Sequence, residues 1–294
     1  MLCACIDIGS NTTRVLVADV VDGRLREVLQ QRAFTRIGKG LKGGEIPREK
    51  IAEVARVVAE QRAIVEQLGC VALRVVATAA IRNADNAAEF TATLRTEGGV
   101  DVEVLDGAEE ARLAFAGATR TLGEPLAGSV GVVDVGGGST ELAIGTLAGG
   151  ATWSASFRVG SGLLTDHYRR ADPPSAAELH AMREYAHGVF EGLDLPPVGA
   201  AVAVGGSAAS LRRLVGATLD GDSLQRAMQV LAAEPADAVA ERFSIDRERV
   251  LLMPAGLTVL DAAGAAFGRP LMIGRGGLRE GVIFELAGSS IDRS

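Results

Sequence analysis

The sequence is poor in the residues that build metal centres and disulfide frameworks. Its 294 residues include only three histidines and three cysteines, and His167, His180 and His187 do not have the spacing of a metal site. An odd number of cysteines favours a reducing compartment, so we expect a cytoplasmic protein without disulfides. Cys3 and Cys5 lie in one apolar run, where packing in the core explains them better than chemistry does.

Long apolar runs and an excess of positive charge are also absent. No uninterrupted apolar stretch approaches the roughly 20 residues of a membrane span, and the chain opens directly on a strand pattern. We therefore expect neither a membrane anchor nor a signal peptide. A net charge of −7 argues against general binding to nucleic acid or to anionic membranes. A local patch of arginine and lysine can still oppose that overall charge and bind a polyanionic substrate.

The strongest functional signal is the stretch 132–141, which reads VVDVGGGSTE. Three consecutive glycines let backbone N–H groups converge on one point, and such a concavity binds anions. Ser139 and Thr140 add donors, while Asp134 and Glu141 suit a magnesium ion or an attacking water. The pattern predicts a strand, a phosphate-binding loop and a second strand. The alternative is a glycine-rich hairpin without a function, because short glycine patterns recur by chance.

A second loop of the same design lies near the N-terminus. Residues 5–17 read CIDIGSNTTRVLV, with Asp7 and Gly9 between two apolar runs. Neither loop carries the Gly-Lys-Ser/Thr ending of a Walker loop, and neither leads into a helix as a dinucleotide-binding fingerprint does. Two Asp-x-Gly hairpins at the starts of two halves are what a phosphotransfer clamp needs, with each half holding phosphate from one side of a cleft.

Apolar periodicity predicts the same plan in both halves, three strands followed by alternating helices and strands. Glycine and proline between residues 123 and 128 mark the best linker, so we expect domains at 1–124 and 125–294. Hydrophobic content of 48% is ample for two cores. The predicted helices are 48–68, 86–96, 108–122, 163–170, 176–193, 208–214, segments within 223–243, 254–267 and a C-terminal helix.

The chain carries six short motifs, which are Asp7–Thr12, Ala77–Arg82, Gly107–Ala111, Asp134–Glu141, Val204–Ser207 and Gly277–Gly281. Their order and spacing resemble the exopolyphosphatase and guanosine pentaphosphate phosphatase family (Ppx/GppA) of the actin-like ATPase superfamily. The resemblance covers nearly the whole chain, in the short two-domain form. It implies an α/β fold of two actin-like, ribonuclease H-like domains, with mixed sheets flanked by helices, a cleft between them, and a C-terminal helix that often packs back on the first domain.

The resemblance implies roles for the site residues. Glu110 matches the family's catalytic glutamate and would orient or deprotonate the attacking water; without the family match, paired acids at a helix start are typical of the surface. Asp7, Asp134 and Glu141 are candidates for holding Mg²⁺, directly or through water. Manganese in its place and stimulation by potassium are left open. The phosphate-binding candidates are Gly9, Ser10, Asn11, Arg82, Gly136, Gly137, Gly138, Ser139, Thr140, Gly206 and Ser207.

Further positive residues are weaker candidates. Arg14 and Arg249 could hold the tail or the nucleoside part of a substrate, and a structural salt bridge explains each of them equally well. Gly274-Arg275 stands where the family commonly has Ser-Asp, which puts an acidic role at that position in doubt. The basic, glycine-rich segment 36–44 is either a lip that meets phosphates or a solvated loop.

These features predict a magnesium-dependent hydrolase that releases terminal phosphate from inorganic polyphosphate, from guanosine pentaphosphate, or from both. The chain stops where the two actin-like domains stop, so we expect short polyphosphates to be preferred. An actin-like small-molecule kinase and a non-catalytic regulator that binds guanosine pentaphosphate are the alternatives. We expect neither nucleic acid nor membrane as a partner. The oligomeric state, a homodimer included, is left open.

Overall fold

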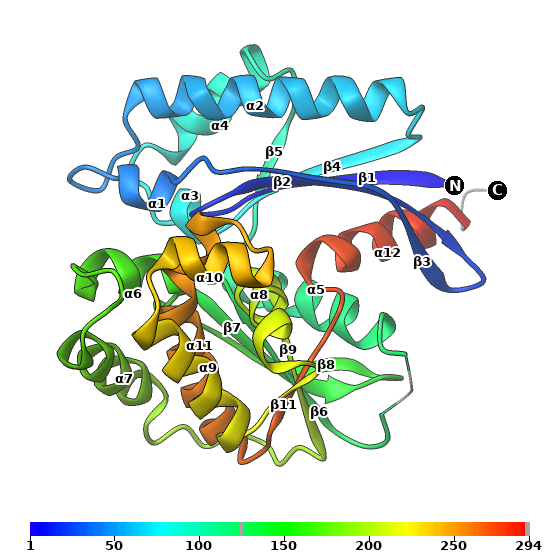
Figure 1. Ribbon diagram of the computed structural model, residues 1–294. Coiled ribbons are helices and arrows are strands. Elements are labelled where there is room, and N and C mark those ends of the chain that lie inside the picture. Colours follow the sequence, from blue (N-terminus) through cyan, green and yellow to red (C-terminus); the bar gives the residue numbers. More distant parts are fainter. Residues whose placement is uncertain (124–125, 292–294) are drawn as a thin grey trace.

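The computed structural model describes residues 1–123 and 126–291 and contains two β-sheets, one in each half of the chain (Figure 1). The first sheet has the strand order β3-β2-β1-β4-β5, and the second has the order β10-β11-β9-β6-β7-β8. Their strands are β1 (Leu2–Ile8), β2 (Thr13–Val21), β3 (Arg24–Ala33), β4 (Ala72–Ala77), β5 (Val102–Val104), β6 (Val130–Val135), β7 (Thr140–Thr146), β8 (Gly150–Phe157), β9 (Ala200–Val204), β10 (Thr218–Leu219) and β11 (Leu271–Ile273).

The two sheets repeat one topology. In the first, β1 pairs antiparallel with β2 and parallel with β4, and β4 pairs parallel with β5. In the second, β6 pairs antiparallel with β7 and parallel with β9, and β11 extends the parallel part. Each Asp-x-Gly motif is therefore the turn of the first hairpin of its sheet. The fold is the predicted α/β architecture of mixed sheets flanked by helices. Strand β10 is the edge strand of the second sheet and pairs antiparallel with β11.

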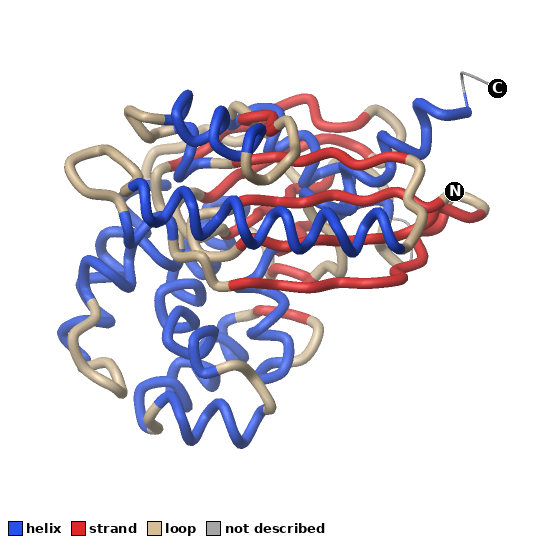
Figure 2. Tube along the Cα trace, turned by 90° about the horizontal axis from the view of Figure 1, so that it is seen from above, coloured by secondary structure: helices blue, strands red, loops and turns tan. Residues whose placement is uncertain are grey.

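Helices cover the outer face of each sheet. In the first half, α2 runs along the strands, as Figure 2 shows, and the side chains beneath it form one apolar cluster with the sheet. In the second half, α11 lies in the centre of a larger cluster. The helices are α1 (Ile37–Gly40), α2 (Arg48–Gln67), α3 (Ala79–Arg82), α4 (Ala87–Thr96), α5 (Gly107–Arg120), α6 (Ser161–Tyr168), α7 (Ala176–Phe190), α8 (Gly205–Val215), α9 (Gly221–Ala233), α10 (Ala236–Phe243), α11 (Arg247–Phe267) and α12 (Leu278–Ile291).

Two helices lie between the sheets and exchange partners. Helix α5, from the first half, packs on β7 and β8, while the C-terminal helix α12 packs on β1 and β2. The two helices also pack on each other at two glycines: a Cβ on Gly117 would collide with the Gly277 carbonyl, and a Cβ on Gly281 would collide with the Leu113 carbonyl. We call each sheet with its covering helices a lobe. The crossing of α5 and α12 brings the start of each helix to the space between the two lobes. The predicted boundary at 124/125 lies outside the described residues.

Helix α11 begins at Arg247, seven residues before the predicted start at Pro254. Pro254 is inside the helix, where it removes one backbone hydrogen bond; burial of Met253, Ala255 and Leu257 around it supports the helix through this point. By length and composition, α11 could cross a membrane, but 67% of its most apolar window is buried inside the protein. It is the core helix of the second half.

Candidate active site

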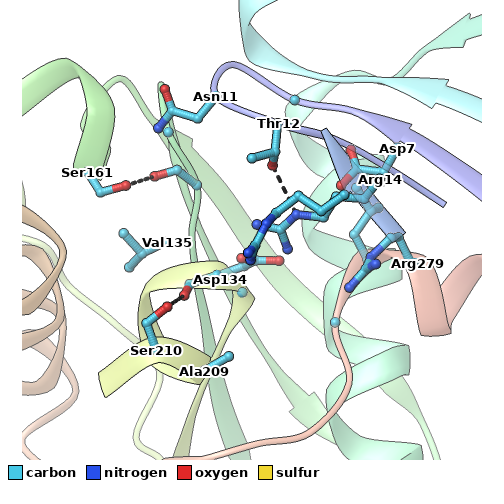
Figure 3. A pocket seen from close by; sticks show the side chains of 18 of the residues that line it. Asp7, Asn11, Thr12, Arg14, Asp134, Val135, Ser161, Ala209, Ser210 and Arg279 are labelled. Atoms are coloured by element: carbon cyan, nitrogen blue, oxygen red, sulfur yellow. Dashed lines mark hydrogen bonds between the residues drawn. The ribbon is translucent and has the colours of Figure 1, made fainter. Parts of the chain in front are cut away.

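A cavity of about 430 Å³ lies between the two lobes. Its walls come from the β1–β2 and β6–β7 turns, from the first residues of α8, α11 and α12, and from Glu110 of α5. Figure 3 shows Asp7, Arg14, Asp134 and Arg279 extending into the same space from different elements. The carboxylates and the glycine turns line one part of the cavity, and arginines line the rest.

The two glycine turns are closed by equivalent backbone hydrogen bonds. Gly9 N–H donates to the Thr12 carbonyl at 3.0 Å, and Gly136 N–H donates to the Ser139 carbonyl at 3.0 Å. The first N–H groups of α6 donate to the carbonyls of Gly136 and Gly137, which fixes the second turn from behind. Within the described residues, the N–H groups of Gly137 and Gly138 donate to no carbonyl, so they are available for an anion.

The turns approach each other so closely that only glycine fits at their contact. A Cβ on Gly137 would lie 2.6 Å from Asn11 Nδ2, and a Cβ on Gly138 would lie 2.6 Å from Ser10 Oγ. Asn11 also faces Gly162 at the start of α6, where a Cβ would again lie 2.6 Å from Nδ2. The first turn therefore lies against the second, and a phosphate bound by both would be held from the two lobes at once.

Asp7 and Asp134 end the first strand of each hairpin and share the cavity. Burial, followed by the charge of Asp7, raises the pKa of Asp134 to about 6. Burial also raises the pKa of Asp7, and the charge of Arg14 opposes that rise. Gly205, with φ +83°, passes so close to Asp134 Oδ1 that any side chain there would collide with the carboxylate. The backbone at the start of α8 is thus fitted to this carboxylate.

Glu110 enters the cavity because α5 begins just before it. Asp106 caps the helix by accepting a hydrogen bond from Glu109 N–H at 2.8 Å. Successive helical residues point about 100° apart, so Glu109 reaches the surface and pairs with Arg112, while Glu110 is only 7% exposed. Burial, and next the charge of Glu141, raises the pKa of Glu110 well above its usual range.

Glu141, in β7, lines the same cavity as Glu110. Its carboxylate accepts a hydrogen bond from Ser156 Oγ at 2.8 Å. Burial, followed by the charge of Asp134, raises the pKa of Glu141 to about 7, and hydrogen bonds from Ser139 and Ser156 oppose the rise. Glu110, Glu141 and Asp134 therefore repel one another in a space largely closed to water, and a cation or a proton would relieve that repulsion.

The other part of the cavity is rich in arginine. Arg249 is 8% exposed, and its Nε has no hydrogen-bond partner in the described chain. Arg14 Nε donates to Thr12 Oγ1 at 2.9 Å. Both guanidinium groups come so close to Gly206 that a Cβ there would collide with them. Buried guanidinium groups that repel one another form a site suited to an anion with several charges.

Most of the predicted site residues line this cavity, and three do not. Arg82 donates instead to Glu110 Oε2 at 2.9 Å and to the Leu105 carbonyl at 2.8 Å. The Thr140 hydroxyl is buried and donates to the Val159 carbonyl at 2.6 Å. Ser207 is buried in α8 against Gly256. The predicted residues that line the cavity are Asp7, Gly9, Ser10, Asn11, Arg14, Glu110, Asp134, Gly136, Gly137, Gly138, Ser139, Glu141, Gly206 and Arg249.

Several lining residues carry no signal in the sequence. Arg32, in β3, lines the cavity and pairs with Asp246, just before α11. Ser161 lines it from the start of α6 and donates to the Gly136 carbonyl at 3.1 Å. Ser210 lines it from α8. These side chains come from elements far apart in the chain, so only the packing of the lobes brings them together.

No group of three or more histidine, cysteine, aspartate or glutamate side chains in the described residues is arranged to hold a metal. Asp7, Asp134 and Glu141 thus line the cavity without forming a closed protein cage. Magnesium usually keeps several waters and takes one or two carboxylates together with phosphate oxygens. The carboxylates that line the cavity fit that mode of binding.

Two lobes of one topology, each with an Asp-x-Gly hairpin facing a shared cleft, define an actin-like fold built for phosphate chemistry. The model of the Ppx/GppA phosphatase family matches residues 16–290, and the chain belongs to this family. It is therefore a member of a family of phosphate-releasing hydrolases, and the family predicted from the sequence is confirmed.

Known proteins similar to this chain agree with that assignment. Exopolyphosphatase 1 of Mycobacterium leprae is 29% identical over 98% of this chain and 90% of the relative. Exopolyphosphatase 2 of Mycobacterium tuberculosis is 36% identical over 61% of this chain and 59% of the relative. The crystal structure of the Aquifex aeolicus member of the Ppx/GppA family has a TM-score of 0.82 at 27% identity and covers 99% of this chain and 98% of that one.

Proposed function

We propose that this protein is an exopolyphosphatase that removes the terminal phosphate of an inorganic polyphosphate chain. The observation that carries the proposal is the position of Glu110. It is a buried glutamate that lines the same part of the cavity as the two glycine turns. A phosphoanhydride hydrolase needs a phosphate cradle, a positioned base for water and positive charge for the remainder of the substrate. The cavity offers one group of residues for each of these needs.

In this proposal, the terminal phosphate lies between the β1–β2 and β6–β7 turns. Ser10, Gly137 and Gly138 donate to its oxygens, and Glu110 accepts a proton from the attacking water. The remaining phosphates extend along Arg14, which is half-buried, and Arg249, which is buried and whose Nε has no hydrogen-bond partner in the described chain. Such an arrangement places the acidic end of the cavity at the reacting phosphorus and the basic end at the chain.

Mg²⁺ is the cofactor we propose, with Mn²⁺ as a substitute and K⁺ as a stimulant to be tested. Asp7, Asp134 and Glu141 are the residues that would hold it, one or two of them directly. Bound there, the ion would neutralise phosphate charge. Its charge would also offset the carboxylate repulsion that adds to burial in raising the pKa values of Asp134 and Glu141.

The finer specificity is also a proposal. Guanosine pentaphosphate is also a polyanion with a terminal phosphate. It could use the same cradle and the same arginines, and we propose it as a second substrate. We further propose cytoplasmic location and a preference for short polyphosphates. The support for short chains is a cavity of about 430 Å³ that lies within the two lobes.

The test is release of inorganic phosphate with Mg²⁺ from tripolyphosphate, long polyphosphate, guanosine pentaphosphate and ATP in parallel, with Glu110→Gln beside the wild type. We expect turnover of tripolyphosphate that falls at least about a hundredfold in the variant, the usual scale for a general base. No release from any substrate by folded protein would contradict the proposal. Phosphate transfer from ATP to an acceptor would instead indicate a kinase, and binding of guanosine pentaphosphate without release would indicate a regulator.

A further inference from the structure

Arg279 lies at the inner wall of the cavity, in the first turn of α12. It is 9% exposed, and its Nη1 is buried without a hydrogen-bond partner among the described residues. Its one ion pair there, with Glu280, spans 4.0 Å and is therefore loose. Buried donors are almost always satisfied, so one without a partner beside a cavity indicates a place where a ligand supplies the acceptor.

Arg279 lies between the carboxylate-lined part and the arginine-lined part of the cavity. Figure 3 shows its guanidinium group next to Asp7 and Arg14. Its charge acts on both ends: it opposes, after Arg14, the burial that raises the pKa of Asp7, and it adds to the burial that lowers the pKa of Arg14 to about 10. Arg279 thus lies where the acidic part of the cavity meets the basic part.

The backbone that carries Arg279 is held on all sides. Gly277 N–H donates to Glu280 Oε2 at 2.8 Å. A Cβ on Gly276 would lie 2.7 Å from Thr121, and a Cβ on Gly281 would collide with the Leu113 carbonyl. The start of α12 is therefore packed between α5 and the first sheet. A donor on such a support needs little reorganisation when charge develops beside it, which is what transition-state stabilisation requires.

We propose that Arg279 is a further catalytic residue, which donates to the leaving oxygen of the phosphate chain. The inference rests on the proposed function. A water oxygen forms a bond to the terminal phosphorus, and its proton passes to Glu110. The bond from that phosphorus to the bridging oxygen breaks, and the bridging oxygen keeps the electron pair as the new end of the shortened chain. Arg279 lies between the cradle and the arginines and meets that negative charge.

Arg279 would act in the transition state, whereas Arg14 and Arg249 would act in substrate binding. Those two side chains would contact phosphates whose charge is the same before and after the step, so they would contribute to substrate binding. A donor to the leaving oxygen contributes mainly in the transition state and lowers kcat when it is removed. The kinetic constant that changes therefore distinguishes the two roles.

The experiment compares wild type, Arg279→Ala, Arg279→Lys and Arg120→Ala with tripolyphosphate at saturating Mg²⁺. Arg120 contacts Phe284 of α12, with 3.9 Å between its guanidinium carbon and the ring centroid, so it controls for a general loosening of this helix. We expect kcat of Arg279→Ala to fall roughly a hundredfold or more, the scale of one lost transition-state donor. KM should stay within about threefold, Arg279→Lys should retain an intermediate kcat, and Arg120→Ala should resemble wild type.

Chemical rescue distinguishes a catalytic role from a purely structural one, because added guanidinium would not restore kcat if Arg279 only supported the fold. Guanidinium chloride at tens of millimolar should restore kcat of Arg279→Ala at least about tenfold over sodium chloride at equal ionic strength, and should not stimulate wild type. A kcat within about threefold of wild type, a loss confined to KM, or failure of rescue would overturn the inference while the proposed function stood. Absence of turnover in wild type would overturn the proposed function itself. If Arg279→Ala fails to fold, Arg279→Lys decides by the same split between kcat and KM.

Discussion

Arg82 donates a hydrogen bond from Nη1 to Glu110 Oε2 at 2.9 Å, and the same nitrogen donates to the Leu105 carbonyl at 2.8 Å. Arg82 is the last residue of α3, directly after β4, so its guanidinium reaches the start of α5 from the neighbouring strand. The contact opposes the burial and the charge of Glu141, which together raise the pKa of Glu110. Arg82 therefore holds the candidate base and favours its charged form.

Replacing Arg82 by glutamine should move the acid limb of the pH profile of kcat/KM to higher pH. A base must be deprotonated to accept the water proton, so the rate falls as pH drops through the pKa of Glu110. Loss of Arg82 removes a contact that lowers this pKa, and the fall then begins at higher pH. At pH 6, we expect Arg82→Gln to be at least about tenfold slower than wild type, and the deficit should shrink towards pH 9.

Arg112→Gln is the control for that profile. Arg112 lies on α5, the helix of Glu110, and pairs with Glu109 outside the cavity. Arg112→Gln removes one positive charge, as Arg82→Gln does, but leaves the contact with Glu110 intact, so its acid limb should coincide with that of wild type. If Arg82→Gln also kept the wild-type limb, Arg82 would not set the protonation of the base.

The pair illustrates how much of this site could be predicted from the sequence. The glycine turns and their aspartates were predictable, because Asp7 and Asp134 each follow an apolar run and precede glycine. Periodicity shows that Glu109 and Glu110 lie at a helix start, but which of them faces inward depends on the packing of α5 against β8. The resemblance to the family, and not the pattern, selected Glu110.

The direction of long side chains could not be predicted. The sequence predicts a phosphate contact for Arg82, but in the structure its side chain reaches α5, because α3 ends beside the start of that helix. Arg279 is not among the predicted site residues, because no local pattern in the sequence indicates that α12 begins at the cavity. Apolar periodicity predicts the order of strands and helices, and the family resemblance implies the actin-like fold. These contacts depend instead on how two lobes of the same topology meet.

Asp134→Asn should stabilise the metal-free protein at alkaline pH. Burial and the charge of Asp7 raise the pKa of Asp134 to about 6, so its charged form is disfavoured in the folded state relative to the unfolded state. For an acid with a raised pKa, the penalty is complete above the folded pKa and disappears below the unfolded value, about 3.9. In urea unfolding with EDTA, we expect a gain of roughly 1–3 kcal/mol at pH 8 that vanishes near pH 4.

Asp22→Asn is the matched control for that measurement. Asp22 occupies an exposed turn with φ +50°, which asparagine also tolerates. The same loss of one charge should therefore leave unfolding within about 0.5 kcal/mol of wild type at both pH values. A gain in Asp134→Asn that persisted at pH 4 would show that the charge of Asp134 is not its cause.

Gly137→Ala should impair turnover more than stability. The added methyl group would lie 2.6 Å from Asn11 Nδ2 and 3.2 Å from Ser10 Cβ, so the two turns would have to separate. Misplacement by about 1 Å costs up to roughly a hundredfold in rate, and we expect at least tenfold. Gly123→Ala, where nothing lies within 4 Å of the added carbon, should behave as wild type. Equal rates for the two variants would mean that the contact between the turns is not needed for catalysis.

Gly117→Ala should destabilise the fold, because α5 and α12 touch through their backbones at this residue. A methyl group there would collide with the Gly277 carbonyl and would lie 2.7 Å from the Gly281 nitrogen. Backbone cannot yield as a flexible side chain can, so α12 would have to move off the first sheet. We expect the free energy of unfolding in urea to fall by about 1–3 kcal/mol or more.

Gly188→Ala is the control, at an exposed site in α7 with nothing within 4 Å of the added carbon. Its free energy of unfolding should instead rise by about 0.5–1 kcal/mol from helix propensity. Equal stability of the two variants would contradict close packing of α5 on α12, and the same displacement of α12 should lower turnover in Gly117→Ala alone.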